Sequence, residues 1–331
     1  MRTRLLPRTA VDLTEIGFGA AQLGNLNRAT TDEDSTAAVD AAWNAGIRYF
    51  DTAPHYGLGL SERRLGRALA AYPRDTVVLS TKVGRLLEPS PGTADATDDQ
   101  GFVVPATTRR RWDFSRDGVL RSLEESLTRL GTDRVDVVYL HDPDDHEASA
   151  STTGVETLAE LRDQGVVRAI GVGMNQSAMP TRFVEQGLID AVMLAGRLTV
   201  LDHGALLDLV PAARAAGVAI VAAGVYNSGI LARPVVPERA SFDYHDAPPE
   251  LLERARAIAA VAARHDLTLP QVAVQYALAF DVVASVVLGT RTAEHVAAAV
   301  ANHDAAAPPQ LWADLVAAGL LDAPPTGGTP A

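Results

Sequence analysis

Four polar residues stand near the ends of three apolar runs, and together they could carry a proton. Asp51 and Tyr56 lie in FDTAPHYG, Lys82 lies in LSTKVG, and His141 directly follows VVYL. A free phenol has a pKa of ~10, which is too high for acid–base work near neutrality. Lys82 could lower the pKa of Tyr56, Asp51 could keep Lys82 charged, and His141 could orient a substrate oxygen. This set suits hydride transfer, with Tyr56 moving the proton and a nicotinamide moving the hydride.

Each of these side chains also has an ordinary structural explanation. Asp51 could cap a turn, Tyr56 could fill space, Lys82 could be a solvated charge, and His141 could be a core histidine. The functional interpretation therefore depends on whether the fold brings three neighbouring strands to one opening.

The rest of the chain predicts such a fold, because short apolar runs alternate with segments of helical period. Runs that are apolar almost throughout are typical of parallel strands covered on both faces. The expected strands are 15–19, 48–51, 77–82, 135–141, 167–172, 191–194, 218–223 and 282–288. The expected helices are 32–45, 61–70, 115–130, 155–164, 179–186, 204–216 and a group after residue 249. Eight strand–helix units predict an α/β fold, a single-domain (β/α)₈ TIM barrel over residues 1–331. A doubly wound sheet is disfavoured because no G-x-G-x-x-G follows an early strand.

Local signals agree with these boundaries. Thr31 and Thr268 stand where helices begin, and each has an acidic or amide residue three positions on, as in a capping box. Gly46, Gly165 and Gly217 end helices and lead directly into strands, which is typical of left-handed C-caps. Two long inserts, 84–112 after the third strand and 224–249 after the seventh, are expected as loops on the C-terminal face, where barrel active sites lie. Residues 322–331 are expected to be a flexible tail.

Composition excludes several classes of function. The 331 residues include no cysteine, so thiolate nucleophiles, disulfides and iron–sulfur clusters are excluded. There are 41 Asp and Glu against 29 Lys and Arg, and this net charge of −12 argues against a nucleic-acid partner. No apolar run reaches the ~20 residues of a membrane-spanning helix. We expect a cytoplasmic protein with a small-molecule substrate and no membrane partner.

The chain resembles the aldo-keto reductase superfamily, whose tetrad of Asp, Tyr, Lys and His matches Asp51, Tyr56, Lys82 and His141. The similarity extends over about residues 9–303 and includes GFGAAQLG, FDTAPHYG, LSTKVG, GVGMNQ, GVYNSGIL and VVLGTRTAEHV. RRRWDFSRDGVLRSLEESL and LAGRLTVLD are similar to the sugar-oxidising branch, the aldose 1-dehydrogenases, and a pyridoxal dehydrogenase shares much of that signature. The resemblance implies an NAD(P)-dependent oxidoreductase that is a monomer or homodimer. Its substrate would be a sugar hemiacetal, pyridoxal, or a small aldehyde or ketone.

The resemblance also implies a cofactor lying across the C-terminal face. Asn175 matches the position that holds the nicotinamide carboxamide, and the loop 225–231 would cover the pyrophosphate. Arg291 and His295 could pair with a 2′-phosphate, so NADP is favoured over NAD, although Gly289 stands where many NADP-specific members carry Lys. Tyr226 could stack under the nicotinamide or could simply pack its loop. The implied cofactor contacts are Gly19, Ala20, Asn175, Val225, Tyr226, Ser228, Gly229, Leu231, Gly289, Thr290, Arg291 and His295.

The sequence indicates the substrate contacts less closely than the catalytic residues, and it leaves alternative chemistries open. His55, Trp112 and Tyr139 are candidate substrate residues, and Trp112 could equally anchor its own loop. The run RRR at 109–111 is interpreted as solvated charge. Asp142, Asp144, Asp145 and His146 resemble metal ligands, but we favour a loop-and-cap role and predict no metal site. A metal-dependent barrel hydrolase and a non-catalytic, cofactor-binding regulatory subunit remain alternatives.

Overall fold

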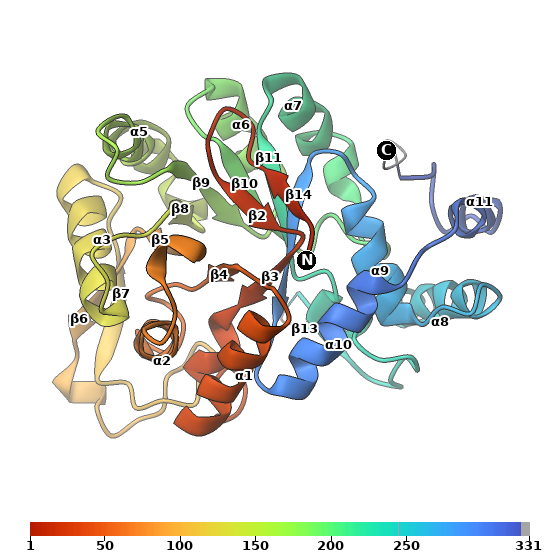
Figure 1. The fold of residues 1–331 in the computed structure, drawn as a ribbon, viewed down its shortest axis with the longest axis horizontal. Coiled ribbons are helices and arrows are strands. Elements are labelled where there is room, and N and C mark those ends of the chain that lie inside the picture. The colour runs from red at the N-terminus through yellow and green to blue at the C-terminus, as the bar shows by residue number, and fades with distance from the viewer. Residues whose placement is uncertain (244, 326–331) are drawn as a thin grey trace.

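Eight parallel strands close into a barrel at the centre of the molecule (Figure 1). The structure is a computed structural model that describes residues 1–325, residue 244 excepted. Around the barrel the strands follow the order β10-β11-β14-β3-β4-β5-β8-β9. The barrel strands are β3 (Ile16–Gly19), β4 (Tyr49–Asp51), β5 (Val78–Val83), β8 (Val137–His141), β9 (Ala169–Met174), β10 (Ala191–Ala195), β11 (Ala219–Ala223) and β14 (Val283–Gly289). The predicted (β/α)₈ barrel is confirmed, and every predicted strand lies within about two residues of an observed one.

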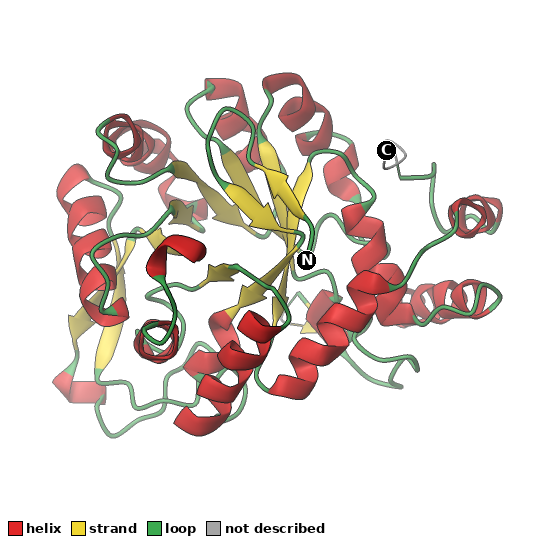
Figure 2. Ribbon diagram, in the orientation of Figure 1, coloured by secondary structure: helices red, strands yellow, loops and turns green. Residues whose placement is uncertain are grey.

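Helices surround the strands on all sides (Figure 2). They are α1 (Asp32–Asn44), α2 (Leu60–Leu69), α3 (Arg116–Leu130), α4 (Glu147–Ser149), α5 (Val155–Asp163), α6 (Ala178–Gln186), α7 (Leu209–Ala216), α8 (Pro249–Ala263), α9 (Leu269–Leu278), α10 (Ala293–Asp304) and α11 (Pro309–Ala317). The predicted caps are present: the Thr31 side chain accepts from the Asp34 amide, and Thr268 forms a capping box with Gln271. Gly46, Gly165 and Gly217 all have positive φ, as the left-handed end of a helix requires.

Within the described residues, three antiparallel hairpins are attached to the barrel, and the sequence pattern did not predict them. The first pairs β1 (Thr3–Leu5) with β2 (Asp12–Thr14), the second pairs β6 (Arg85–Pro89) with β7 (Thr108–Trp112), and the third pairs β12 (Ser241–Phe242) with β13 (His245–Asp246). The second and third lie in the inserts that were expected to be loops. Their strands are short and polar, so no apolar periodicity reveals them.

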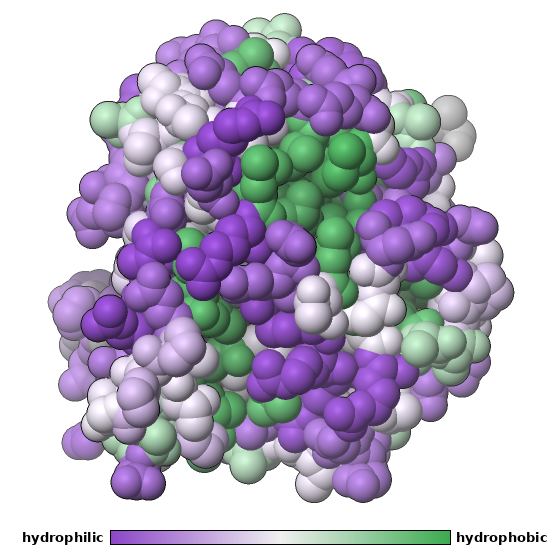
Figure 3. All heavy atoms as spheres, turned by 90° about the vertical axis from the view of Figure 1, so that its left-hand side faces the viewer, coloured by the Kyte–Doolittle hydropathy of each residue, from purple (hydrophilic) through white to green (hydrophobic). Residues whose placement is uncertain are grey.

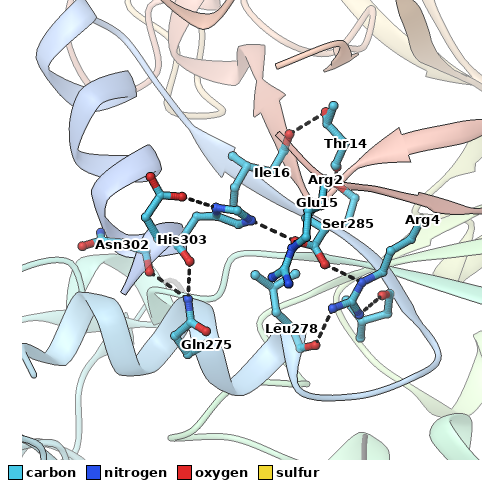
Figure 4. A network of polar contacts seen from close by, with 12 residues as sticks. Arg2, Arg4, Thr14, Glu15, Ile16, Gln275, Leu278, Ser285, Asn302 and His303 are labelled. Atoms are coloured by element: carbon cyan, nitrogen blue, oxygen red, sulfur yellow. Dashed lines mark hydrogen bonds and ion pairs between the residues drawn. The ribbon is translucent and has the colours of Figure 1, made fainter. Parts of the chain in front are cut away.

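The N-terminal hairpin is fastened to the barrel by charged side chains. Arg4 donates to the carbonyls of Leu278, Phe280 and Val283 and to the carboxylate of Glu15. Glu15, which directly precedes β3, also accepts from Arg2 and lies 2.9 Å from Nε2 of His303 on α10 (Figure 4). The hairpin, the first barrel strand and α10 are therefore held together by one buried carboxylate.

Most buried apolar side chains form two layers, one between strands and helices and one inside the barrel, and a third, small cluster consists of Leu58, Phe102 and Val104. The inner layer consists mainly of Val and Ala, and it also contains the fully buried rings of Tyr49 and Tyr139. The surface on the side that carries α3 and the β6–β7 hairpin is mostly hydrophilic, with an apolar patch in its upper half (Figure 3). None of the described helices is long and apolar enough to cross a membrane. Of the predicted tail, residues 326–331 lie outside the described residues.

Candidate active site

The carboxyl ends of the barrel strands place an ion pair at one opening. Asp51 is the last residue of β4, and Lys82 lies near the end of the adjacent β5. The Nζ atom of Lys82 is 2.6 Å from Oδ2 of Asp51 and donates to the Thr52 carbonyl at 3.0 Å. Both side chains are almost fully buried. Burial is the largest single effect and lowers the pKa of Lys82, but the charges of Asp51 and Tyr56 and the hydrogen bonds with them together raise it, so the ammonium stays protonated.

Tyr56 is brought to this ion pair by a tight loop between β4 and α2. The loop packs directly on the turn after β3: a Cβ atom at Gly57 would lie 2.2 Å from the Gly24 carbonyl oxygen, and φ of Gly57 is +62°. Only glycine meets both conditions. The Lys82 ammonium consequently lies 4.8 Å from the centroid of the Tyr56 ring.

The acidity of Tyr56 is set by two opposing effects. Burial raises the pKa of the phenol, whereas the Lys82 charge lowers it, and the net pKa lies above the ordinary value of 10.0. The predicted effect of Lys82 is therefore present, but an overall lowering is not observed because desolvation of a fully buried phenolate is the larger contribution. In this state Tyr56 is a neutral phenol beside a permanent positive charge.

Two neutral histidines complete the opening. His141 is the last residue of β8, and its ring centroid lies 5.8 Å from that of Tyr56 and 5.5 Å from that of His55. Burial, followed by the positive charge of Arg85, lowers the pKa of His55 to about 2 and holds that of His141 well below 6.5. The Nδ1 atoms of both rings are buried and lack a hydrogen-bond partner in the described part of the chain. Unpaired polar atoms of this kind are available to a ligand.

The first insert forms the wall behind His55. Arg110 and Asp98 make a buried ion pair with an N–O distance of 2.5 Å, and Arg110 also donates to the His55 carbonyl at 3.0 Å. The interpretation of residues 109–111 as solvated charge is thus wrong for Arg110, whose side chain is only 3% exposed. Arg109, at 71% exposed, does fit it. The buried pair supports the backbone of His55, a function that no local pattern indicates.

Trp112 is the last residue of β7, in the same insert, and pairs in register with Arg85. Its ring stacks near His146 with centroids 6.3 Å apart, and the Arg85 guanidinium lies 5.3 Å from its centroid. Arg85 is also paired with Asp142, at 2.5 Å, directly after His141. Trp112 therefore anchors its loop beside the opening. Tyr139 is fully buried inside the barrel, so its expected role as a substrate contact is wrong.

The run of acidic residues after His141 is held by its neighbours. Asp142 pairs with Arg85, Asp144 accepts from Gln176, and His146 lies against Trp112 and Phe114. Within the described ranges, no three His, Cys, Asp or Glu side chains converge in a group that could hold a metal ion.

Comparison with known proteins identifies the family to which this arrangement belongs. The model of the aldo/keto reductase family matches residues 15–318. The chain is 44% identical over 319 residues to D-threo-aldose 1-dehydrogenase of Pseudomonas sp, an alignment covering 93% of this chain and 95% of that protein. The chain belongs to the aldo/keto reductase family. It is accordingly an NAD(P)-dependent oxidoreductase.

Two further relatives agree with this assignment. Pyridoxal 4-dehydrogenase of Microbacterium luteolum is 36% identical, with 96% of this chain and 97% of that protein covered. Among solved structures, the holo form of the aldo-keto reductase AKR11C1 from Bacillus halodurans superposes with a TM-score of 0.75 at 27% identity, covering 93% and 92% of the two chains.

The loops after β9 and β11 of this aldo/keto reductase carry several of the residues expected to contact the cofactor. Asn175, directly after β9, is half-buried, and its side-chain amide makes no hydrogen bond to the described residues. The backbone carbonyl of Asn175 accepts from Nε of Arg197 at 2.7 Å. Arg197 also pairs with Asp202 at 2.9 Å and with Asp243 at 2.5 Å, so it connects the loops after β9, β10 and β11. Arg197 was missed in the sequence, where it is one arginine in an apolar run.

The loop after β11 has its own internal hydrogen bonds. The amides of Asn227, Gly229 and Leu231 donate to carbonyls of residues 224 and 226, whereas those of Val225 and Tyr226 have no acceptor among the residues that the structure describes. Ser228 and Gly229 are exposed, and Val225 and Leu231 are buried. The Tyr226 hydroxyl accepts from Asn302 of α10 at 3.0 Å, which fixes the end of its ring against α10.

The eighth strand and α10 form the remaining part of the rim. Gly289 pairs with Gly19, which in turn pairs with Asp51, and these three positions lie at one level of the barrel. The carbonyl of Ala20, next to Gly19, already accepts from Ser61. Thr290 is buried with an unpartnered hydroxyl among the described residues, and Thr292 caps α10 by accepting from the His295 amide.

Arg291 is not free to meet a phosphate in the way that the sequence suggested. Its guanidinium donates to the carbonyls of Leu26 and Arg28 and to the Thr30 hydroxyl at 2.6–2.7 Å. The adjacent Arg28 is exposed and has no carboxylate partner within the described chain. Burial, followed by the charge of Arg28, lowers the pKa of both Arg291 and His295. Beside Arg291, Arg28 thus offers a positive charge that no carboxylate pairs with in the described part of the chain.

Proposed function

We propose that this chain oxidises the anomeric carbon of an aldose to an aldonolactone, with NAD(P) as the hydride acceptor. This proposal rests chiefly on the position of the buried Lys82 ammonium, which lies 2.6 Å from Oδ2 of Asp51 and 4.8 Å from the centroid of the Tyr56 ring. A tyrosine held beside a permanent positive charge is suited to proton transfer at a carbon–oxygen bond. The similarity to D-threo-aldose 1-dehydrogenase, and the two buried imidazole nitrogens of His55 and His141 that have no partner among the described residues, support a polyhydroxylated substrate.

The roles of the side chains follow from their positions. Tyr56 must first be ionised; then, as the C1–H bond breaks and its electron pair leaves as hydride, the Tyr56 phenolate takes the proton of the C1 hydroxyl, and the C1–O bond becomes a carbonyl. Lys82 stabilises the phenolate before it takes the proton, and Asp51 keeps Lys82 in place. His141, which is neutral, donates to or accepts from the reacting oxygen, and His55 contacts a neighbouring hydroxyl. In the reverse direction Tyr56 returns the proton to the carbonyl oxygen.

The cofactor would be held by the rim already described. Asn175 would bind the carboxamide, the free amides of Val225 and Tyr226 would contact the pyrophosphate, and the start of α10 would receive the adenosine end. We propose that NADP is the preferred cofactor, with Arg28 contacting its 2′-phosphate. The positions of Gly19, Ala20, Ser228, Gly289 and Thr290 along the same rim are compatible with this path.

The test replaces Tyr56 with Phe and measures turnover by nicotinamide absorbance. The panel contains D-threo aldoses, pyridoxal and small aldehydes, each with NAD and with NADP. Loss of the phenolic hydroxyl should lower kcat by about 10²–10⁴-fold, while cofactor binding measured by fluorescence quenching should be unchanged. Because burial raises the pKa of Tyr56, oxidation should also accelerate with rising pH and reduction should slow.

Tyr72→Phe is the matched control, because the Tyr72 hydroxyl is bound to Asp40 on the outside of the barrel. Retention of activity in Tyr56→Phe would exclude the proposed proton carrier. Turnover of pyridoxal but of no aldose would support the proposed proton transfer and show that the substrate is not an aldose.

A further inference from the structure

A chain of three buried hydroxyl groups extends from the Asp51 carboxylate into the barrel. The Tyr139 and Tyr49 hydroxyl oxygens are 3.3 Å apart, those of Tyr49 and Ser80 are 3.1 Å apart, and Ser80 lies 2.7 Å from Oδ1 of Asp51. We propose that Tyr139, Tyr49 and Ser80 are positioning residues that stabilise ionised Asp51 and thereby hold Lys82 against Tyr56. This inference rests on the proposed function of the Asp51–Lys82 pair.

The direction of the chain follows from the number of protons available. An ionised carboxylate only accepts, so the single Ser80 proton is directed to Asp51. Ser80 must then accept from Tyr49, whose own proton is used in that bond, and Tyr49 must accept from Tyr139. Every hydroxyl therefore donates toward the charge, and the distances shorten in the same direction. Aligned donors polarise one another, which strengthens the last bond to the carboxylate.

The neighbouring strands leave space for the two phenols. A Cβ atom at Gly17 of β3 would lie 2.7 Å from Cδ1 of Tyr49, and one at Gly171 of β9 would lie 2.9 Å from Cδ1 of Tyr139. In the register of the barrel these glycines are directly beside the tyrosines. Around them the inner layer is apolar, and there a hydroxyl costs free energy unless it is bonded. Phe would fill the same space, so the hydroxyls contribute something other than packing.

The carboxylate depends on such donors because of its surroundings. Burial raises the pKa of Asp51, and Lys82, followed by Ser80, opposes this effect. The polar groups near it are Lys82 and Ser80 from β5, Tyr49 from its own strand, Tyr56 from the following loop, and Tyr139 and His141 from β8. On its other side β3 contributes only IGFG, which carries no titratable side chain. Loss of one hydroxyl should therefore favour protonation of Asp51, and Lys82 would lose its partner.

The experiment compares Tyr49→Phe, Tyr139→Phe and wild type by their pH profiles of kcat for aldose oxidation. The acidic limb reports the coupled ionisation of Asp51, Lys82 and Tyr56. We expect Tyr49→Phe to move this limb to higher pH by about half a unit to one unit. Tyr139→Phe should move it less, and both variants should reach the wild-type rate on the alkaline plateau with an unchanged KM for the cofactor.

Tyr276→Phe is the matched control, since Tyr276 is a buried phenol of α9 that lies outside the chain of hydroxyls. It should leave the limb unmoved. If Tyr49→Phe does not fold, Ser80→Ala tests the same inference. Ser80→Thr, which keeps the hydroxyl, should then restore the position of the acidic limb. A purely structural role would lower kcat equally at all pH values, and that result, or an unmoved limb, would overturn the inference. An active Tyr56→Phe enzyme would instead refute the proposed function itself.

Discussion

The carboxylate of Glu15 should make a large electrostatic contribution to stability at the N-terminal end of the barrel. Its side chain is 4% exposed and is bound by Arg2, Arg4 and His303 (Figure 4). Burial raises the pKa of Glu15, but the hydrogen bond with His303 and the charges of Arg4 and Arg2 lower it to about 2, against an ordinary value of 4.5. One pKa unit corresponds to ~1.4 kcal/mol, so the ionised carboxylate stabilises the fold by ~3 kcal/mol at neutral pH.

The perturbation is Glu15→Gln, which keeps the shape of the side chain and removes its charge. A pKa that is lowered in the folded state stabilises the protein above the unfolded value, and this contribution is lost as pH falls through the folded value. The difference in unfolding free energy between wild type and Glu15→Gln should therefore be ~3 kcal/mol at pH 7 and should fall to about half of that near pH 3.

The assay is urea unfolding followed by the fluorescence of the three tryptophans, at several pH values from 7 downward. Glu124→Gln is the control, because Glu124 is exposed on α3 and has no ion-pair partner among the described residues; it should change stability by less than ~0.5 kcal/mol. A difference below ~1 kcal/mol for Glu15→Gln at pH 7, or one that stays constant down to pH 3, would refute the reasoning.

Two further predictions concern single side chains. The hydrogen bond with Glu15 raises the pKa of His303, so protonated His303 contributes fully to stability below pH 6.5, and this contribution is lost as pH rises through the folded pKa. The unfolding free energy of wild type should therefore fall above neutrality, whereas that of His303→Gln should depend less on pH. Parallel curves for the two proteins would contradict this prediction. Arg28→Ala should raise the KM for NADP roughly tenfold and leave the KM for NAD within about twofold, with Arg121→Ala on α3 as the control; an equal effect on both cofactors would show that Arg28 does not contact the 2′-phosphate.

The barrel could be predicted from the sequence because its elements are encoded locally. Strands such as 191–194 and 218–223 are apolar throughout. Gly217 separates the second of these from the preceding helix, and Gly165 does the same for strand 167–172. Apolar runs of this kind predict parallel strands irrespective of what surrounds them. The hairpin β6–β7 has no such pattern, since its second strand is TRRRW, and its pairing depends on contacts made after the chain has folded.

The candidate site divides in the same way. Asp51, Tyr56, Lys82 and His141 could be named in advance because parallel strands deliver the residues at their carboxyl ends to one rim. The sequence could not predict which individual charged side chains are buried and which are exposed. Arg110 and Arg109 are neighbours in one run, yet Arg110 is buried against Asp98 and Arg109 is exposed. Arg291 binds backbone carbonyls, whereas Arg28, in the loop before α1, has no carboxylate partner among the described residues.

The sequence by itself determined the number and order of the barrel strands and the four polar residues near their carboxyl ends, since both follow from patterns within a few residues. Only the tertiary structure decided the ionisation of those residues. The pKa of Tyr56 is raised although Lys82 is adjacent, because desolvation depends on every atom packed around the phenol. The hydroxyl chain of Tyr139, Tyr49 and Ser80 likewise exists only where β4, β5 and β8 meet, with glycines on neighbouring strands leaving space for the rings.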